Sequence, residues 1–203
     1  MLVTGIKSKP VYAPLQADTR GRFHLMLGMG VGAAPLLRVI EEMRLTAAHS
    51  LKNTRVMFVP DAGASPAIEQ FKAASLGDVG QFPQTPALLA QFRTLLGDAY
   101  MGTRLYVAGP ESFIGLVMKI ALEFNLNKDE IRAEECGTAA RRVYCIHCRS
   151  TTEEVQTNIV RCIGCERWLL VRDHYSRRLA AYMGVMVDAE SPGELPPLRK
   201  VFL

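Results

Sequence analysis

Four cysteines in two closely spaced pairs constrain this chain more than any other feature. The first pair is Cys145-Ile-His-Cys148, and the second, thirteen residues further on, is Cys162-Ile-Gly-Cys165. A Cys-x-x-Cys turn places both sulfurs on one side of a tight knuckle, and two such pairs are the ligand set of a tetrahedral four-sulfur metal site. The sequence therefore predicts that these four cysteines bind one metal ion. Such a site usually holds zinc and less often a single iron ion, and the four cysteines alone do not decide between them.

The residues between the two pairs, from Ser150 to Arg161, are polar and carry several β-formers. This pattern predicts a hairpin that returns the second knuckle opposite the first, with Gly164 helping the second turn. A disulfide framework is the rival interpretation. Cys136 makes the number of cysteines odd, and the chain does not begin with a charged-then-apolar signal segment, so we expect reduced thiols in a cytoplasmic protein.

Other side chains near the knuckles have simpler interpretations. His147 lies inside the first knuckle, but four cysteines already complete a tetrahedron, so we expect it at the surface. Cys136 is expected to be a small buried apolar residue. Trp168, His174 and Tyr175 are expected to form the small core that a metal module builds beside its knuckles.

Positive charge is concentrated around the cysteines. The segment from Arg141 to Arg178 holds eight arginines and four acids, and so carries a net charge equal to the +4 of the whole chain. Such a basic patch suits an acidic protein partner or a nucleic-acid backbone, and it is also compatible with a solvated surface. Lysine is scarce there and few aromatic residues adjoin the arginines, so we expect no nucleic-acid partner. The apolar run Leu25 to Leu37 is too short and too rich in glycine to span a bilayer, so we expect no membrane partner.

The part of the chain before the cysteines predicts an α/β fold with a parallel sheet. A strand over residues 22–28 runs into the turn Gly28-Met-Gly-Val-Gly-Ala-Ala-Pro35, and apolar residues then recur at helical spacing. Further strands are predicted at 54–60, 104–107 and 131–134, with turn signals at Asp61-Ala-Gly63, and helices around 65–75, 86–97 and 113–124. Strands that alternate with helices imply a parallel sheet with helices on both faces.

The glycine-rich turn admits two interpretations. Gly28, Gly30 and Gly32, followed by Pro35 at the start of the helix, would let a backbone approach a phosphate at a helix N-terminus. The same glycines would also serve a tight strand-to-helix turn without any ligand.

These patterns divide the chain into four parts. We expect an N-terminal extension over residues 1–21, a nucleotide-binding-type domain over 22–138, and a four-cysteine, zinc-ribbon-like module over 139–183. Residues 184–203, which contain the segment Ser191-Pro-Gly-Glu-Leu-Pro-Pro197, are expected to form a proline-rich tail.

Three segments, in the right order, resemble the nicotinamide-binding half of the ferredoxin reductase-like family. Gly30-Val-Gly-Ala-Ala-Pro-Leu-Leu37 is similar to that family's glycine turn, and Ala108-Gly-Pro-Glu-Ser-Phe113 to its Cys-Gly-Pro-Glu-x-Phe segment, which faces the nicotinamide. Ile131-Arg-Ala-Glu-Glu-Cys136 is similar to its closing strand. The resemblance implies an NAD-binding fold and adds Gly109 and Pro110 to the glycine-turn residues as candidate nucleotide contacts.

The chain also departs from that family. The strand ending at Phe58-Val-Pro60 is followed by Asp61 and no arginine. Asp61 suits a ribose hydroxyl but would repel a 2′-phosphate. Residues 1–21 are too few to form the flavin-binding barrel that precedes this half in the family. Without a flavin, a bound NAD(P)H has no resident hydride acceptor, so the sequence predicts that the fold is kept and the catalysis is not.

A nucleotide-binding-type domain fused to Cys145-Ile-His-Cys148, Cys162-Ile-Gly-Cys165-Glu-Arg-Trp168 and Asp173-His-Tyr-Ser-Arg-Arg178 resembles the small accessory subunit of bacterial dimethylamine monooxygenase. The resemblance implies a haem-binding oxygenase subunit and a reductase subunit with FMN and an iron–sulfur cluster as partners. Such complexes use NADPH and O2 to convert dimethylamine to methylamine and formaldehyde. This chain would then act as a scaffold or an electron relay. The alternative is an autonomous NAD(P)H-dependent flavin or ferredoxin-type reductase.

Overall fold

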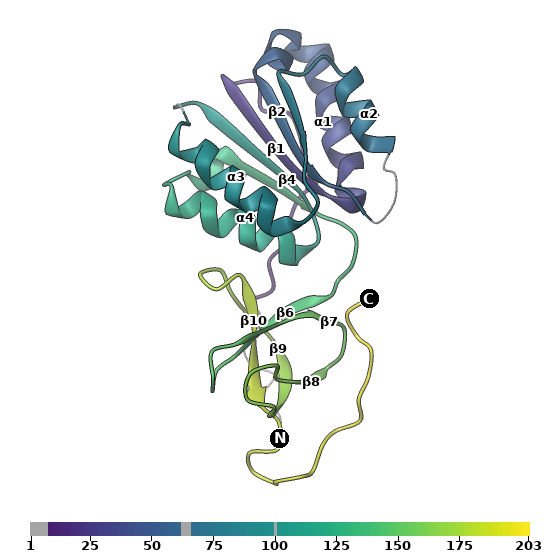
Figure 1. Ribbon diagram of the computed structural model, residues 1–203, viewed down its shortest axis with the longest axis vertical. Helices are drawn as coiled ribbons and strands as arrows, with labels where there is room; N and C mark the ends of the chain where they lie inside the picture. Colours follow the sequence, from purple (N-terminus) through teal and green to yellow (C-terminus); the bar gives the residue numbers. More distant parts are fainter. Residues whose placement is uncertain (1–7, 62–65, 100) are drawn as a thin grey trace. The chain divides into compact units, whose positions relative to one another are not determined.

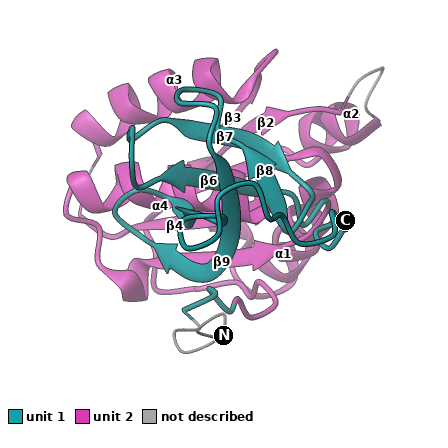
Figure 2. Ribbon diagram, turned by 90° about the horizontal axis from the view of Figure 1, so that it is seen from below, with its two compact units in different colours: residues 1–11, 138–203 teal, residues 12–137 magenta. Residues whose placement is uncertain are grey.

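The computed structural model describes residues 8–61, 66–99 and 101–203. The chain forms two compact units, coloured separately in Figure 2. One unit comprises residues 12–137. The other comprises residues 138–203 together with residues 8–11 near the N-terminus. The predicted turn at Asp61-Ala-Gly63 and the first seven residues of the predicted N-terminal extension fall largely outside the described residues.

The unit of residues 12–137 is built on a five-stranded parallel sheet (Figure 1). Its strands, in chain order, are β1 (Phe23–Met29), β2 (Thr54–Val59), β3 (Asp78–Gln81), β4 (Thr103–Gly109) and β5 (Ile131–Glu135). In space they are ordered β3-β2-β1-β4-β5, so β1 is central. Gly28 near the end of β1 lies in register with Phe58 of β2 and Ala108 of β4, which aligns the carboxyl ends of the three central strands.

Helices cover both faces of this sheet, as predicted. Helices α1 (Ala33–Thr46) and α2 (Pro66–Ala73) pack on one face, against buried side chains such as Met26, Phe58 and Tyr106. Helices α3 (Thr85–Gly97) and α4 (Glu111–Glu123) pack on the other face, against Leu27 and Val107. Neighbouring strand residues such as Met26 and Leu27 are both buried because both faces of a parallel sheet are covered. Among the described residues, no helix is both long and apolar enough to cross a membrane.

The central strands and all four helices lie within a few residues of their predicted positions, but β3 was not predicted. Its sequence Asp78-Val-Gly-Gln81 is short and polar, and it pairs only with β2 at the edge of the sheet. An edge strand of this kind buries little of its surface, here only parts of Val79 and Gly80, so its sequence shows no apolar alternation and a loop was predicted instead.

The chain enters the sheet through a segment anchored by two side chains. Leu15 is buried against the α1 side of the sheet. Asp18 is also buried, its backbone N–H donates to the Tyr106 hydroxyl at 2.9 Å, and its carboxylate pairs with Arg20 at 2.8 Å and Arg104 at 3.2 Å. These hydrogen bonds hold the pKa of Asp18 well below its usual range, the side-chain bond from Arg20 contributing most.

The second unit is a five-stranded mixed sheet. Its strands are β6 (Arg141–Cys145), β7 (Thr151–Val155), β8 (Ile159–Arg161), β9 (Trp168–Ser176) and β10 (Ala181–Met186). They are ordered β7-β6-β10-β9-β8, and only the pair β10 and β6 is parallel.

The hairpin predicted between Ser150 and Arg161 is wrong. The two strands of that segment, β7 and β8, lie at opposite edges of the sheet: β7 pairs with β6, and β8 pairs with β9. Each Cys-x-x-Cys pair is therefore itself the turn of a hairpin. The β-formers predicted two strands correctly, but they carry no information on which partner each strand takes.

The chain's last residues pack against the same sheet. Lys200 forms an isolated bridge with Thr157, and the backbone N–H of Phe202 donates to the carbonyl of Gln156 at 3.0 Å. The guanidinium of buried Arg141 lies 3.8 Å from the centre of the Phe202 ring and 3.9 Å from that of Tyr182. This stacking ties the chain's end to β6 and β10.

Candidate metal centre

The two knuckles that carry the cysteines share one backbone design. In the first, the N–H of Cys145 donates to the carbonyl of Ser150 at 2.9 Å, and the N–H of Arg149 donates to the carbonyl of Cys145 at 2.9 Å. In the second, Cys162 pairs in the same way with Arg167 at 2.9 Å and with Glu166 at 3.0 Å. The residue after each second cysteine has a positive φ, 68° at Arg149 and 58° at Glu166. The two turns therefore have the same hydrogen-bond pattern and the same backbone conformation after the second cysteine.

The four sulfurs converge on one point. The Sγ atoms of Cys145 and Cys165 are 3.8 Å apart, those of Cys148 and Cys162 are 3.4 Å apart, and all four lie within 4.8 Å of one another. A tetrahedral ion with metal–sulfur bonds of about 2.3 Å requires sulfurs about 3.8 Å apart. The predicted ligand set is therefore assembled with the spacing that a single ion needs. A cluster of several irons would hold its thiolates further apart, because they would bind different metal atoms.

The pKa values of Cys145, Cys148 and Cys165 are shifted in different directions. Burial raises the pKa of Cys145 to about 11. Hydrogen bonds from the side chain and backbone of Ser150 lower the pKa of exposed Cys148 to about 6. The backbone N–H of Arg167 lowers the pKa of Cys165. Donors therefore point at the outer sulfurs, which favours thiolates, the form that binds a metal.

Gly164 was predicted to favour the second turn, and the structure shows that it also lets the two knuckles pack closely. A Cβ built at this position would lie 2.9 Å from the Cβ of Ser150 and 3.1 Å from the Sγ of Cys148. The first knuckle thus occupies the space beside Gly164, and glycine is required because the two knuckles approach so closely.

The other side chains singled out near the cysteines do not join the ligand set. His147 is exposed, and its Nε2 accepts a hydrogen bond from the backbone N–H of Met186 at 3.3 Å. Cys136, expected to be buried, is only half-buried in the unit of residues 12–137, where desolvation raises the pKa of its thiol. Tyr175 lies in the core of the second unit, edge-on to Tyr182, as predicted. Trp168 and His174, expected in the same core, are only partly buried.

The candidate nucleotide-contacting residues gather at the carboxyl ends of β1 and β4. A Cβ at Gly32 would collide with the carbonyl of Ala108, so the glycine turn packs directly on the end of β4. Gly109 closes β4, and the carbonyl of Pro110 accepts hydrogen bonds from the first turn of α4. Gly28 is pressed between Leu36 and Phe58. Pro35 is buried in the first turn of α1.

Carboxylates occupy the same edge of the sheet. Gly30 has a φ of +54°, and a Cβ there would collide with the carboxylate of Asp61. Glu111 is buried at the start of α4, and Glu134 near the end of β5 is paired with Arg38 of α1. The backbone thus offers the close approach that a pyrophosphate needs, while the carboxylate of Asp61 beside Gly30 opposes an anion.

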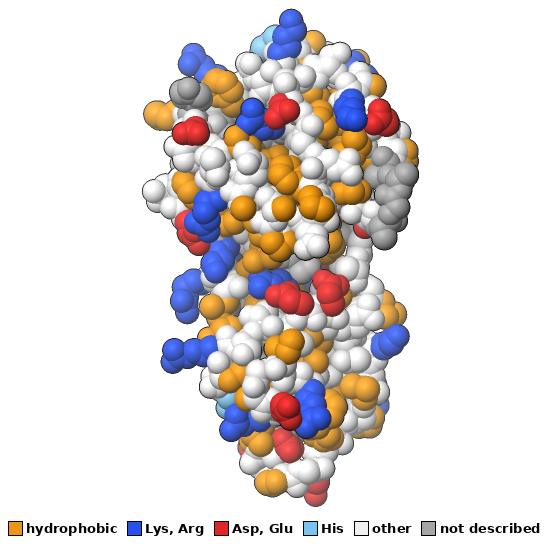
Figure 3. All heavy atoms as spheres, in the orientation of Figure 1, with side chains coloured by type: hydrophobic (Ala, Val, Ile, Leu, Met, Phe, Trp, Pro, Cys, Tyr) orange, Lys and Arg blue, Asp and Glu red, His pale blue; other side chains and the backbone are white. Residues whose placement is uncertain are grey.

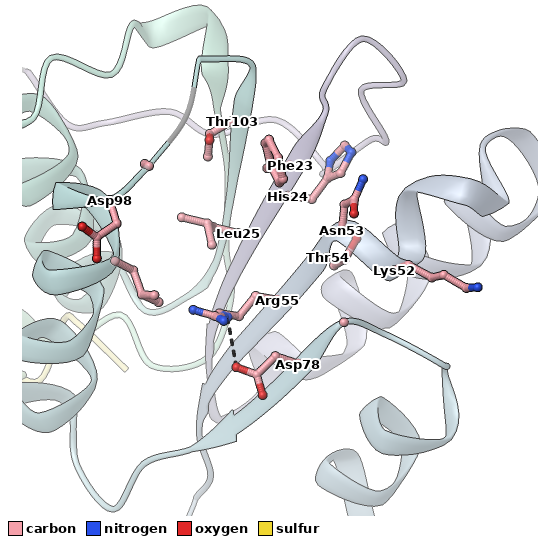
Figure 4. Close-up of a pocket in the computed structure, with 13 residues that line it drawn as sticks. Phe23, His24, Leu25, Lys52, Asn53, Thr54, Arg55, Asp78, Asp98 and Thr103 are labelled. Atoms are coloured by element: carbon pink, nitrogen blue, oxygen red, sulfur yellow. Dashed lines mark ion pairs between the residues drawn. The ribbon is translucent and has the colours of Figure 1, made fainter.

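A surface cavity of about 420 Å³ lies at the opposite, amino ends of the strands (Figure 4). Phe23, Leu25 and Leu95 are among its lining side chains, and Arg55 and Asp78 form an ion pair of 3.0 Å beside it. The sequence did not predict it. It contains none of the candidate nucleotide or metal residues.

Two family models match this chain. Residues 4–131 match the N-terminal domain, and residues 142–185 the C-terminal domain, of the family described as "Dimethylamine monooxygenase subunit DmmA-like". The chain is also similar to the "Heme-dependent oxidative N-demethylase delta subunit" of Ectopseudomonas mendocina (strain ymp). The two are 35% identical over 127 residues, which cover 59% of this chain and 73% of that subunit.

Solved structures similar to the chain include a ferredoxin reductase in carbazole 1,9a-dioxygenase, with 16% identity and a TM-score of 0.43. The match covers 61% of this chain and 34% of that one. The FAD/NAD-binding domain of a nitric oxide dioxygenase from Vibrio cholerae has 18% identity and the same TM-score, over 58% of this chain and 52% of that one. The chain thus spans about a third to a half of these proteins.

Proposed function

Because the chain belongs to the family of DmmA-like subunits of dimethylamine monooxygenase, we propose that it is an accessory subunit of a haem-dependent N-demethylating complex. In this proposal the complex uses NADPH, a proton and O2 to convert dimethylamine to methylamine and formaldehyde, with release of NADP⁺ and water. The haem, the FMN and the iron–sulfur cluster reside on partner subunits. The observation that carries the role of this chain is its convergent four-cysteine centre.

The four cysteines would hold one zinc or one iron ion. Zinc there is structural and redox-silent, whereas a single iron on four thiolates exchanges one electron. The same residues of this chain would surround either a zinc ion or an iron ion. Cys145 and Cys162 are buried beside the core of the second unit, and Cys148 is exposed toward solvent. Ser150 and the backbone of Arg167 donate hydrogen bonds that stabilise the outer thiolates.

The unit of residues 12–137 would serve as a scaffold that does not turn over a nucleotide. The carboxylate of Asp61 lies against Gly30, where a pyrophosphate would have to approach. A carboxylate there repels a second negative charge, and solvent weakens this repulsion because Asp61 is exposed. Hydride transfer would therefore remain with the reductase subunit, and this chain would position its partners.

Co-purification tests the accessory role. The tagged chain is expressed together with the remaining subunits of the N-demethylase, and the captured proteins are quantified after size-exclusion chromatography. The proposal expects a stable hetero-oligomer, and omission of this chain should lower NADPH-dependent demethylation. A chain that elutes alone beside an assembled, fully active complex of the other subunits would overturn the proposal.

The glycine turn favours one second candidate, an autonomous NAD(P)H-dependent reductase with a borrowed flavin. Its support is the backbone geometry, because Gly32 packs on the carbonyl of Ala108 as a tight nucleotide loop would. Titration of the isolated chain with NADH and NADPH tests it, since a reductase should bind one of them at micromolar concentration. Gly32→Val is a poor probe, because any Cβ at this position collides with the backbone of β4 and would damage the fold.

A further inference from the structure

Two exposed isoleucines flank the four-cysteine centre. In each knuckle an isoleucine follows the first cysteine, and the side chains of Ile146 and Ile163 are 46% and 74% exposed. The adjacent cysteines contribute sulfurs that lie within 4.8 Å of each other, so both isoleucines stand directly beside the centre. Apolar side chains that are exposed together and rimmed by polar residues are typical of contact surfaces.

The hydrogen bonds that these two residues make to the fold come from their backbone N–H groups. The N–H of Ile146 donates to the carbonyl of Gly184 at 3.2 Å, and the N–H of Ile163 donates to the Thr152 hydroxyl at 3.4 Å. Any residue except proline supplies that N–H. Neither isoleucine belongs to the core of the second unit, which is built from residues such as Val143 and Leu169. The exposed isoleucine side chains are therefore available to a partner.

Arginines surround this apolar pair. Arg149 and Arg167 are exposed, and neither pairs with a carboxylate among the residues that the structure describes, although the Arg167 side chain also donates a hydrogen bond to the Cys165 sulfur. Arg161 is 63% exposed, and its contact with Glu166 is long, at 3.4 Å. We call Ile146, Arg149, Ile163 and Arg167 the knuckle tip. The visible face of the second unit in Figure 3 shows hydrophobic side chains standing among basic and acidic ones.

We infer that the knuckle tip is the surface by which this chain docks onto another subunit of its complex, at an apolar hollow ringed by carboxylates. An apolar centre with a charged rim is the usual construction of a protein interface, and the positive rim selects a negative partner. A nucleic acid fits less well, because isoleucine offers no stacking face for a base. The inference rests on the proposed function for the identity of the partner. Docking here would place exposed Cys148 at the interface.

The test uses the full chain with the double substitution Ile146→Asp and Ile163→Asp, co-expressed with the other N-demethylase subunits. Leu45→Asp is the matched control, because Leu45 is 79% exposed but lies on α1 of the other unit. We expect capture of the partner to fall by about tenfold or more in the double variant and to stay unchanged in the control. Metal content, measured on the same samples, should be equal in all of them.

Milder and charge-reversed variants keep the test decisive. Ile146→Ser with Ile163→Ser covers the case in which paired aspartates disturb the fold, and Arg149→Glu should weaken capture while reducing its sensitivity to salt. Wild-type capture by metal-loaded tip variants would overturn the docking surface and leave the accessory role standing. Wild-type chain that captures no subunit would overturn both. Variants that lose binding to a single-stranded RNA probe but keep their partner would show that the tip serves a nucleic acid instead.

Discussion

The side chain of Ser150 occupies the space that a side chain at Gly164 would need, with its Cβ 2.9 Å from the site of a Cβ at Gly164. The contact joins the two knuckles, because Ser150 follows the first cysteine pair and Gly164 lies inside the second. The hydrogen bonds from Ser150 also lower the pKa of Cys148. One residue therefore both spaces the knuckles and stabilises a thiolate.

Gly164→Ala should push the knuckles apart. We expect the free energy of unfolding of the metal-loaded second unit to fall by about 1–3 kcal/mol, as for other overpacked sites, and metal to be lost more readily to a chelator. Gly97→Ala is the control, because a Cβ at Gly97 meets nothing within 4 Å. Denaturant unfolding with a parallel chelator titration measures both effects. Equal stability of Gly164→Ala and wild type would contradict the close approach.

Cys162→Ser should release the metal and unfold the second unit alone. A small sheet of this size relies on its ion, whereas the unit of residues 12–137 has apolar cores on both faces of its sheet. Limited proteolysis followed by mass spectrometry should show a protected fragment of about residues 12–137. Cys136→Ser, in the other unit, should keep the metal. Cooperative loss of the whole chain in Cys162→Ser would show that the two units do not fold independently.

Arg141 and Phe202 should be energetically coupled. The Arg141 guanidinium is stacked between the rings of Tyr182 and Phe202 and pairs with Asp173 at 2.8 Å. We expect a double-mutant cycle of Arg141→Ala and Phe202→Ala to give a coupling energy of about 0.5–2 kcal/mol in the unfolding of the second unit. Arg161→Ala with Phe202→Ala serves as the uncoupled control. A coupling energy of zero for the first pair would mean that the chain's end does not hold Arg141.

Stability of the unit of residues 12–137 should decline in acid, and Asp18 should account for a large part of the decline. The folded pKa of Asp18 is lowered, so its contribution is fully present above the unfolded value near 4 and is lost as the pH falls toward the folded value. The pKa of His24 is lowered by burial, which acts in the same direction below about pH 6.5. Asp18→Asn should remove about 2–3 kcal/mol of stability at pH 7 and flatten the profile between pH 5 and about 2. Urea unfolding of wild type and Asp18→Asn across this pH range measures the effect. If the free energy of unfolding of the variant fell with pH as steeply as that of the wild type, the role given to Asp18 would be contradicted.

The buried strands and the metal ligands could be read from the sequence because burial and coordination leave local patterns. Strands β1, β2 and β4 are apolar runs closed by glycine or proline, and the cysteine pairs carry their own spacing. Strand β3 left no such pattern, since its residues are polar and lie at the sheet edge.

Pairings between distant parts of the chain could not be read in the same way. The strand-forming residues of 150–161 indicated two strands but not that β7 and β8 take different partners. The stacking of Phe202 on Arg141 joins positions far apart in the sequence, and neither residue shows a local signal for the other. The tertiary structure alone reveals such contacts, and the reason for glycine at position 164 is one of them.

The metal content of the purified chain tests the central claim most directly. Elemental analysis and a visible absorption spectrum on one sample should give one ion per chain, either zinc without colour or iron with thiolate charge-transfer bands. The Cys162→Ser variant, prepared in parallel, should contain none. Fewer than about one ion per ten wild-type chains after metal-replete expression, with the four thiols free or joined in disulfides, would contradict the account of these cysteines as a metal centre.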